Sequence, residues 1–196
     1  IDMVKFGESI SIIQKRVTFE NISILDVYEK AIAVFRDYYE YEVIQEADRK
    51  KIEKIPEAAF REAIANSLIH RVWDVESQIR VLMFDDRIEV VSPGGLPSGI
   101  TVNEYLAGKL SALRNRNLAN VFYRLGFVEI FGTGIIRIKQ LYEESLAKPE
   151  FEVSENAIKV VLPIFENNFN LSEDEKAIYK VLSKTMLKSI SEIAPY

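Results

Sequence analysis

The sequence of 196 residues contains no cysteine and only one histidine, His70. The absence of thiols excludes a disulfide scaffold, a thiol nucleophile and any zinc site with a thiolate ligand. It also fits a reducing compartment, and we expect a cytoplasmic protein. A single histidine leaves no set of imidazoles for a multi-histidine metal centre.

Basic charge and long apolar runs are also lacking. The chain has 25 Lys and Arg against 30 Asp and Glu, a net charge of −5, so no global basic field draws it onto nucleic acid. No apolar run approaches the ~20 residues that span a bilayer, and no signal peptide is visible. Because the first residue is Ile1 and not Met, we expect a piece of a longer protein.

What is present is the composition of a soluble folded protein. Hydrophobic residues make up 48% and charged residues 28% of the chain. A chain of this length buries roughly 70% of the surface that it exposes when unfolded, so it can form a stable core without disulfides or structural metal ions. Helical and strand patterns alternate irregularly, with neighbouring strands paired as hairpins. This predicts an α+β fold, a two-layer sandwich with helices on one face of a mixed or antiparallel sheet.

The pattern divides the chain into three parts. Residues 1–20 are a lead-in, and residues 1–25 fit one or two strands or an irregular segment. Residues 21–166 form the main domain, in which the charged stretch 48–54 is expected to be a linker. Residues 167–196 are expected to be a linker and the start of a further helical segment.

Within the main domain, single residues mark the ends of the predicted elements. Helices are predicted to begin at Ser23, at Thr101 and after Gly134, and to cover Pro56 to about Trp73 and residues 117–125. The spacing of Thr101 and Glu104 is that of a capping box. Hairpins are predicted over 79–91, with the turn at 85–86, and over 151–164.

The helix that follows Pro56 carries the first candidate site. Glu62, Asn66 and His70 are spaced four residues apart and therefore lie near one line on the helix. Their arc holds small residues and no Lys or Arg, so another body can approach the backbone closely. A carboxylate can deprotonate or orient water, and a neighbouring amide oxygen can ligate Mg²⁺. The alternative is a helix partly buried against a neighbour, with Glu62 capping another element.

Two glycine segments form the second candidate. Gly132, Thr133 and Gly134 precede a predicted helix, and the free N–H groups of such a helix start suit a phosphate. Gly94 and Gly95 follow a strand, where a flat ligand could lie against the backbone. Taken alone, the first segment is at least as often a plain turn, and the second is more often a loop that needs two residues with positive φ.

The polar segment Arg114–Asn117, R-N-R-N, is the third candidate. Arginine forks match phosphate oxygens, although such clusters are often solvated surface. No G-x-x-x-x-G-K-[ST] phosphate loop occurs, so these residues alone do not form a P-loop helicase motor.

The order of these segments resembles a known family. R-E-A-I-A-N-S-L-I-H-R (61–71), D-R-I-E-V-V-S-P-G-G-L-P (86–97), R-N-R-N-L-A (114–119) and G-T-G-I-I-R-I (132–138) are similar to a RecG-related bacterial and archaeal family. Its name describes the C-terminal part of an ATP-dependent DNA helicase, and many members are called transcriptional regulators. More widely, the order resembles the GHKL or Bergerat ATP-binding fold of gyrase-type topoisomerases, sensor histidine kinases and MutL. The resemblance covers about residues 15–165.

The resemblance implies a role for each matching residue. Glu62 would be the catalytic carboxylate that polarises the attacking water, and Asn66 would ligate Mg²⁺. The implied cofactors are ATP and Mg²⁺. The residues implied to surround the nucleotide are Asn66, His70, Ser92, Gly94, Gly95, Arg114, Gly132, Thr133 and Gly134. Residues between Pro97 and Phe131 would form a lid.

The resemblance also implies a larger setting. A Schlafen-like AlbA domain usually precedes this region in the family, and the lead-in would be its end. A winged helix-turn-helix often follows, so residues 171–196 resemble its beginning. DNA would then be bound by flanking domains, and a homodimer is possible.

One departure from the wider superfamily bears on function. Ser92 stands where an aspartate usually reads the adenine amino group, and a hydroxyl accepts a hydrogen bond less strongly than a carboxylate does. The leading hypothesis is an ATP-binding module, with weak Mg-dependent hydrolysis, in a DNA-associated regulator. The alternative is a degenerate module of the same fold that serves interaction or dimerisation without nucleotide.

Overall fold

The computed structural model describes residues 1–45, 48–108, 113–128 and 132–165. The predicted linker and winged-helix segment at 167–196 lies outside the described residues, as do parts of the predicted lid. No described helix is long and apolar enough to cross a membrane.

The centre of the molecule is a six-stranded sheet with strand order β2-β1-β5-β6-β8-β7. The β1 and β5 strands run parallel and the other neighbours run antiparallel, so the sheet is mixed. The strands of the sheet are β1 (Asp2–Phe6), β2 (Ile13–Thr18), β5 (Arg80–Met83), β6 (Arg87–Pro93), β7 (Glu150–Val153) and β8 (Ala157–Pro163).

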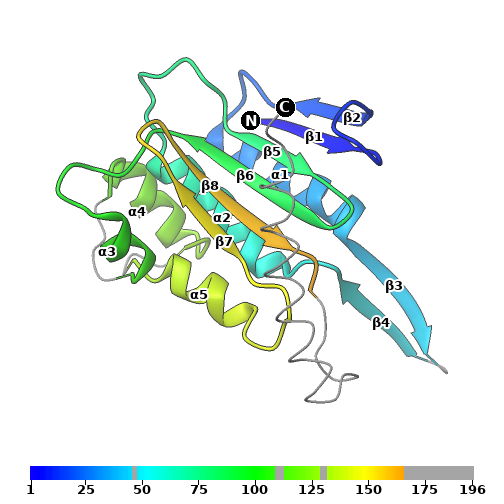
Figure 1. Cartoon of the computed structure of the whole chain (residues 1–196). Helices are drawn as coiled ribbons and strands as arrows, with labels where there is room; N and C mark the ends of the chain where they lie inside the picture. Colours follow the sequence, from blue (N-terminus) through cyan, green and yellow to red (C-terminus); the bar gives the residue numbers. More distant parts are fainter. Residues whose placement is uncertain (46–47, 109–112, 129–131, 166–196) are drawn as a thin grey trace, which may run out of the picture.

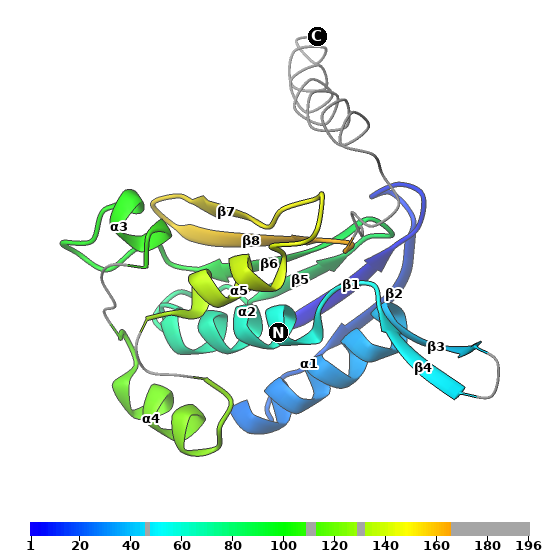
Figure 2. The same ribbon diagram turned by 90° about the horizontal axis from the view of Figure 1, so that it is seen from below.

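Helices cover one face of this sheet, which confirms the predicted α+β two-layer sandwich (Figure 1). Figure 2 shows α1, α2 and α5 side by side beneath the strands. The helices are α1 (Ile24–Tyr39), α2 (Glu57–His70), α3 (Val102–Leu106), α4 (Arg116–Arg124) and α5 (Gly134–Leu141).

Alternation along the strands places the core between the sheet and the helices. In β6, Ile88 and Val90 are buried while Glu89 between them points to the other face. Their partners across the ladder to β8 are Leu162 and Val160, which are also buried. On the helical side, Phe35 and Phe60 stack with ring centroids 4.4 Å apart and join α1 to α2.

The α2 helix is buried on most of its circumference because α1, α4, α5 and β6 all pack against it. It begins after Pro56 and ends at His70, three residues short of the predicted end at Trp73. At its start, Arg36 of α1 donates two hydrogen bonds, of 2.8 and 2.6 Å, to the Glu57 carboxylate. These bonds hold the pKa of Glu57 down at about 2.

The expectation of a charged linker at 48–54 is wrong. Asp48–Glu53 is strand β4, which pairs antiparallel with β3 (Glu40–Gln45) in a separate two-stranded sheet. Diagonal ion pairs join the two strands, Lys51 to Glu40 at 2.8 Å and Arg49 to Glu42 at 3.7 Å, so charges that suggest a linker support a hairpin instead.

The remaining boundaries agree with the sequence patterns. Of the possibilities left open for residues 1–25, the structure has two strands, and both belong to the main sheet. Ser23 caps α1 by accepting a hydrogen bond from the Asp26 N–H. Thr101 and Glu104 form the capping box of α3. Both predicted hairpins of the main sheet are present.

Candidate nucleotide-binding crevice

A crevice opens at the end of β6 where the strand leads into the glycine loop. Its floor is α2, two of its walls are β6 and β8, and the segment 94–105 and the start of α5 complete it. The lining residues are Ala63, Asn66, Ser67, His70, Val90, Ser92, Gly94, Gly95, Leu96, Pro97, Ile100, Tyr105, Arg114, Gly132, Gly134, Ile135, Ile158 and Val160. The structure therefore brings eight of the predicted site residues to one cavity.

Asn66 lines the crevice floor, whereas Glu62 is buried beside it, against Gly134, and does not line the cavity. The Asn66 amide nitrogen donates a 3.0 Å hydrogen bond to Glu62 Oε1. Glu62 is buried, and Arg137 of α5 brings its guanidinium to 4.0 Å from the other carboxylate oxygen. The four-residue spacing thus places both groups side by side, as the helical pattern predicts.

The start of α5 lies directly against this pair. A Cβ built on Gly134 would overlap Glu62 Oε1 and would lie 2.6 Å from Asn66 Nδ2. Only glycine lets the backbone approach the two side chains this closely. Gly132, at the turn before the helix, has a φ of +69°, which also favours glycine. The two glycines therefore allow the N-terminus of α5 to pack directly against Glu62 and Asn66.

Thr133 stands between these glycines and does not line the crevice. Its Oγ1 is buried and has no hydrogen-bond partner among the described residues. A buried hydroxyl without a partner costs stability, about 1–3 kcal/mol. Such an atom marks a place where a polar ligand atom is expected.

Gly94 and Gly95 each lie so close to another part of the chain that a side chain would not fit. Gly94 has a φ of +101°, and a Cβ there would overlap the Val72 side chain. A Cβ on Gly95 would overlap the backbone carbonyl of Glu155 and lie 2.7 Å from that of Ser154, in the β7–β8 turn. These glycines let the loop lie between α2 and the closing hairpin.

Ser92 is buried at the end of β6, and its hydroxyl donates a 3.1 Å hydrogen bond to the Ser67 carbonyl of α2. Because the proton is used in this bond, the oxygen lone pairs remain as acceptors. A hydroxyl at this place can therefore accept a hydrogen bond from a ligand.

Arg114 and Asn115 hold the carboxyl end of α2. The Arg114 guanidinium donates to the carbonyls of His70 (2.7 Å) and Gly95 (3.0 Å). The Asn115 amide donates to those of Ile69 (2.7 Å) and Arg71 (3.2 Å). The predicted phosphate-matching arginine thus uses one terminal nitrogen on a carbonyl at the helix end, where partners are lacking, and the other on a carbonyl of the glycine loop.

His70 lies beneath this arginine. Burial, and then the positive charge of Arg114, lower the pKa of His70 to about 4. The imidazole is therefore neutral at pH 7 and offers one donor and one acceptor nitrogen.

Several lining residues were not predicted from the sequence. Ile158 and Val160 are the cross-strand partners of Ser92 and Val90, so pairing the two predicted hairpins would have found them. Tyr105 comes from α3, and burial raises its pKa to about 12. No residue pattern in the sequence indicates that this tyrosine turns into the crevice.

The crevice is narrow in this conformation. Its volume is about 90 Å³, which suits several water molecules and is too small for a triphosphate. The segment that carries Leu96, Pro97, Ile100 and Tyr105 contributes to its lining. On the α5 side, Lys139 holds the end of α3 through a 2.9 Å hydrogen bond to the Leu106 carbonyl.

Comparison with known proteins places this site in context. Residues 76–162 match an ATPase-like family model described as "Putative ATP-dependent DNA helicase recG C-terminal". The match covers less than half of the chain. It includes β5 to β8 and both glycine segments but begins after Glu62 and Asn66.

A solved structure is similar over most of the chain. It is the crystal structure of the DIP2311 protein from Corynebacterium diphtheriae, with 25% sequence identity and a TM-score of 0.71. The alignment covers 86% of this chain and 35% of that protein, so the chain spans about a third of its length. No curated protein matches the chain.

Proposed function

We propose that this chain is a GHKL-type ATP-binding module, and that Mg-ATP binds in the crevice above Glu62 and Asn66. The observation that carries the proposal is the close approach of Gly134 to the bonded pair of Glu62 and Asn66. An acid, an amide and the start of a helix then meet at one point. This is an arrangement suited to a phosphate with its metal ion.

The donors and acceptors present fit both groups. Asn66 uses its amide nitrogen on Glu62, and its oxygen accepts no hydrogen bond from the described residues, so this oxygen is available to Mg²⁺. Thr133 makes no side-chain cap at the start of α5, and the proposal assigns the first N–H groups of this helix to phosphate oxygens. The Thr133 hydroxyl is a further donor at the same turn. Bound Mg²⁺ would supply charge neutralisation to the phosphates.

The base would lie at the other end of the crevice, beside Ser92 and the Gly94–Gly95 loop. The walls there are apolar, with Val90, Ile158 and Val160 from the two strands. Ser92 accepts a hydrogen bond through its free lone pairs, while the aliphatic walls exclude water from the ring. Because the crevice is too small for a nucleotide as it stands, binding requires the 96–105 segment to move outward.

Calorimetric titration with Mg-ATP tests the proposal. We expect saturable heat for the native chain and none for Asn66→Ala, because the metal ligand is lost. Asn120→Ala is the matched control, since this asparagine lies on the exposed surface of α4, and it should bind as the native chain does. A flat titration of the native chain at millimolar Mg-ATP would refute the proposal.

The role proposed for Glu62 is to polarise the attacking water. If the bound ATP is hydrolysed, Glu62→Gln should retain binding and lose turnover by about a hundredfold or more, because the amide cannot act as a base. Release of inorganic phosphate under saturating Mg-ATP measures this. Undiminished release by Glu62→Gln would remove the residue from the mechanism.

The setting proposed for the module is a DNA-associated protein, of the transcriptional-regulator type, with DNA bound by flanking domains such as an AlbA domain or a winged helix. The support is the family description that residues 76–162 match. In this setting, ATP binding would reorder the lid and change how the flanking domains are presented.

The small volume and apolar lining of the crevice favour one alternative function, an interaction module without nucleotide that forms dimers. Sedimentation with and without Mg-ATP separates the two. A stable dimer that ignores Mg-ATP supports the alternative, and a monomer contradicts it.

A further inference from the structure

A second cavity lies next to the proposed nucleotide crevice. It is an open groove of about 500 Å³, a volume in the range of small-molecule sites. Arg114 lines both the groove and the crevice. The described residues that line the groove are Ile24, Trp73, Leu113, Arg114, Asn115, Arg116, Asn117 and Leu118.

The groove contains the only tryptophan of the chain. Trp73 follows α2, and its side chain is 44% exposed. The Arg71 guanidinium lies 4.5 Å from the centroid of its ring and is itself held by hydrogen bonds to the Val75 and Ser77 carbonyls. One guanidinium covers one face of an indole, so the ring is supported on one side and retains surface that is open to solvent.

The groove is locally positive in an acidic chain. It is lined by Arg114 and Arg116, and none of its described lining residues is acidic. Arg116 is exposed and forms no ion pair with any described residue. Asn117 beside it is also exposed, and its amide has no hydrogen bond to the described part of the chain. The free cation and the free amide therefore lie along the same groove as the indole.

We propose that this groove binds a short segment of single-stranded nucleic acid, with one base stacked on Trp73 and a phosphate on Arg116. Every base has a flat face that stacks on an aromatic ring, and each base is joined to a phosphate that an arginine can bind. An acidic peptide would use the arginines and leave the indole unused. The proposal is independent of nucleotide binding in the crevice.

Trp73 provides its own probe, because no other tryptophan contributes to the fluorescence. Titration with an eight-residue oligothymidylate at low salt should quench this fluorescence saturably. Arg116→Ala should weaken binding about tenfold or more, and should reduce the slope of log affinity against log salt by about one. Arg124→Ala is the matched control, since this exposed arginine lies at the other end of α4, and it should leave binding unchanged.

Binding by variants without the probe is measured by anisotropy of a labelled oligothymidylate. Trp73→Leu should lose about 5- to 100-fold in affinity, the range of one stacked base. Asn66→Ala should bind the oligonucleotide as the native chain does, so failure of the groove and failure of the ATP site are distinguishable.

Four outcomes would overturn the proposal. One is the absence of saturable quenching with the oligonucleotide, and another is an equal effect of Arg116→Ala and Arg124→Ala. The others are equally tight binding of octaglutamate, which would show that charge alone acts, and equally tight binding of thymidine monophosphate, which would identify a free nucleotide as the occupant.

Discussion

The two ends of strand β6 are built in opposite ways. At its first residue, Arg87, the strand leaves a tight turn whose polar groups bond to one another and to the helical layer. At its last residues, Ser92 and Pro93, it enters a glycine loop beside a cavity. The same strand thus joins a hydrogen-bonded turn to the edge of the crevice.

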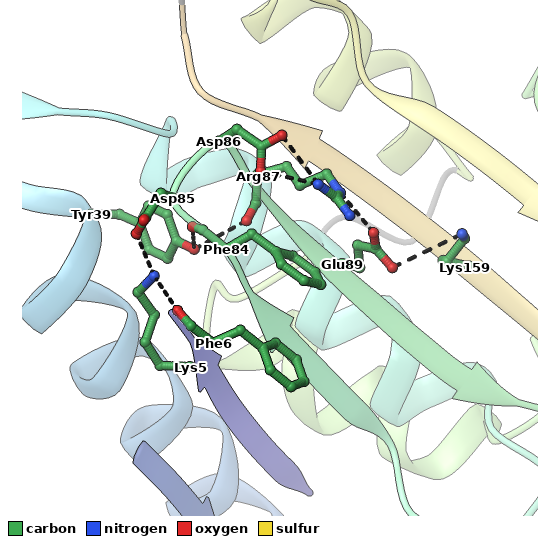
Figure 3. A network of polar contacts seen from close by, with 9 residues as sticks. All are labelled: Lys5, Phe6, Tyr39, Phe84, Asp85, Asp86, Arg87, Glu89 and Lys159. Atoms are coloured by element: carbon green, nitrogen blue, oxygen red, sulfur yellow. Dashed lines mark hydrogen bonds and ion pairs between the residues drawn. The ribbon is translucent and has the colours of Figure 1, made fainter. Parts of the chain in front are cut away.

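The turn end is a saturated network (Figure 3). Tyr39 of α1 donates its hydroxyl to the Phe84 carbonyl at 2.7 Å, with the Arg87 carbonyl at 3.1 Å. Lys5, which is buried, pairs with Asp85 at 2.5 Å. On the same turn, Arg87 bonds to Glu89 at 2.7 Å. The hydrogen-bond partners offset the cost of burying Tyr39 and Lys5.

The crevice end shows the opposite features. Thr133 Oγ1 is buried without a partner among the described residues, burial lowers the pKa of His70, and Gly94 has a left-handed backbone that no larger residue would adopt without strain. The unpartnered hydroxyl and the buried imidazole each lower stability, whereas glycine adopts the left-handed backbone without strain. The turn end therefore satisfies its polar groups within the chain, and the glycine end keeps one that no described residue satisfies.

The largest expected effect is at the turn end. Tyr39→Ala removes a ring that is 2% exposed together with its two hydrogen bonds, and should lower the free energy of unfolding by about 3–5 kcal/mol. Tyr39→Phe, which keeps the ring, should lower it by about 1–3 kcal/mol. Urea denaturation measures both. The comparison fails if Tyr39→Phe is as stable as the native chain, or if it weakens Mg-ATP binding.

Next is the glycine loop. Gly94→Ala should lower the free energy of unfolding by about 2–4 kcal/mol, because the strained φ adds to overlap with Val72. Gly99→Ala is the matched control. Gly99 also has a positive φ, of +86°, but nothing lies within 4 Å of its added Cβ, so the cost should be about 1 kcal/mol. Thermal unfolding measures the loss of stability in the two variants. Equal losses would show that the loop is not packed against Val72.

The neutral histidine predicts a pH dependence of stability. The folded pKa of about 4 lies below the unfolded value of about 6.5, so the unfolded chain takes up the proton first as the pH falls. Between pH 7 and pH 5 the free energy of unfolding should therefore fall by about 2 kcal/mol on account of His70 alone. His70→Gln should remove this part of the slope. Parallel pH curves for the two proteins would contradict the burial of the imidazole.

The smallest expected effect is at Ser92. Ser92→Ala deletes the hydrogen bond to the Ser67 carbonyl and should lower the free energy of unfolding by about 1 kcal/mol. If the hydroxyl also accepts from the base, affinity for Mg-ATP should fall about fivefold, while affinity for Mg-GTP should not change. Competition calorimetry with the two nucleotides measures this. An equal loss for both would place the base elsewhere.

The sequence predicts the fold well where local patterns are sufficient. The alternation of Ile88 and Val90 and the capping residues Ser23 and Thr101 set element types and ends without reference to the rest of the chain. The β3–β4 hairpin could not be predicted in this way. Residues 48–54 are as charged as a linker, and only their pairing with Glu40–Gln45 brings Lys51 to Glu40 and Arg49 to Glu42.

In the candidate site, too, the features set by local spacing could be predicted and those set by long-range packing could not. The pairing of Glu62 with Asn66 follows from helical spacing, which is a local property. The approach of Gly134 to that pair, the use of Arg114 on backbone carbonyls and the position of Tyr105 depend on how distant segments pack. No spacing within a single segment contains that information.

The central claim is that Mg-ATP occupies the glycine-lined crevice, and a crystal structure with Mg²⁺ and a non-hydrolysable ATP analogue tests it most directly. The account predicts phosphate oxygens at the first N–H groups of α5, the metal ion at the Asn66 amide oxygen, and Tyr105 displaced from the crevice. Analogue bound elsewhere, or an unchanged crevice at saturating analogue, would contradict it.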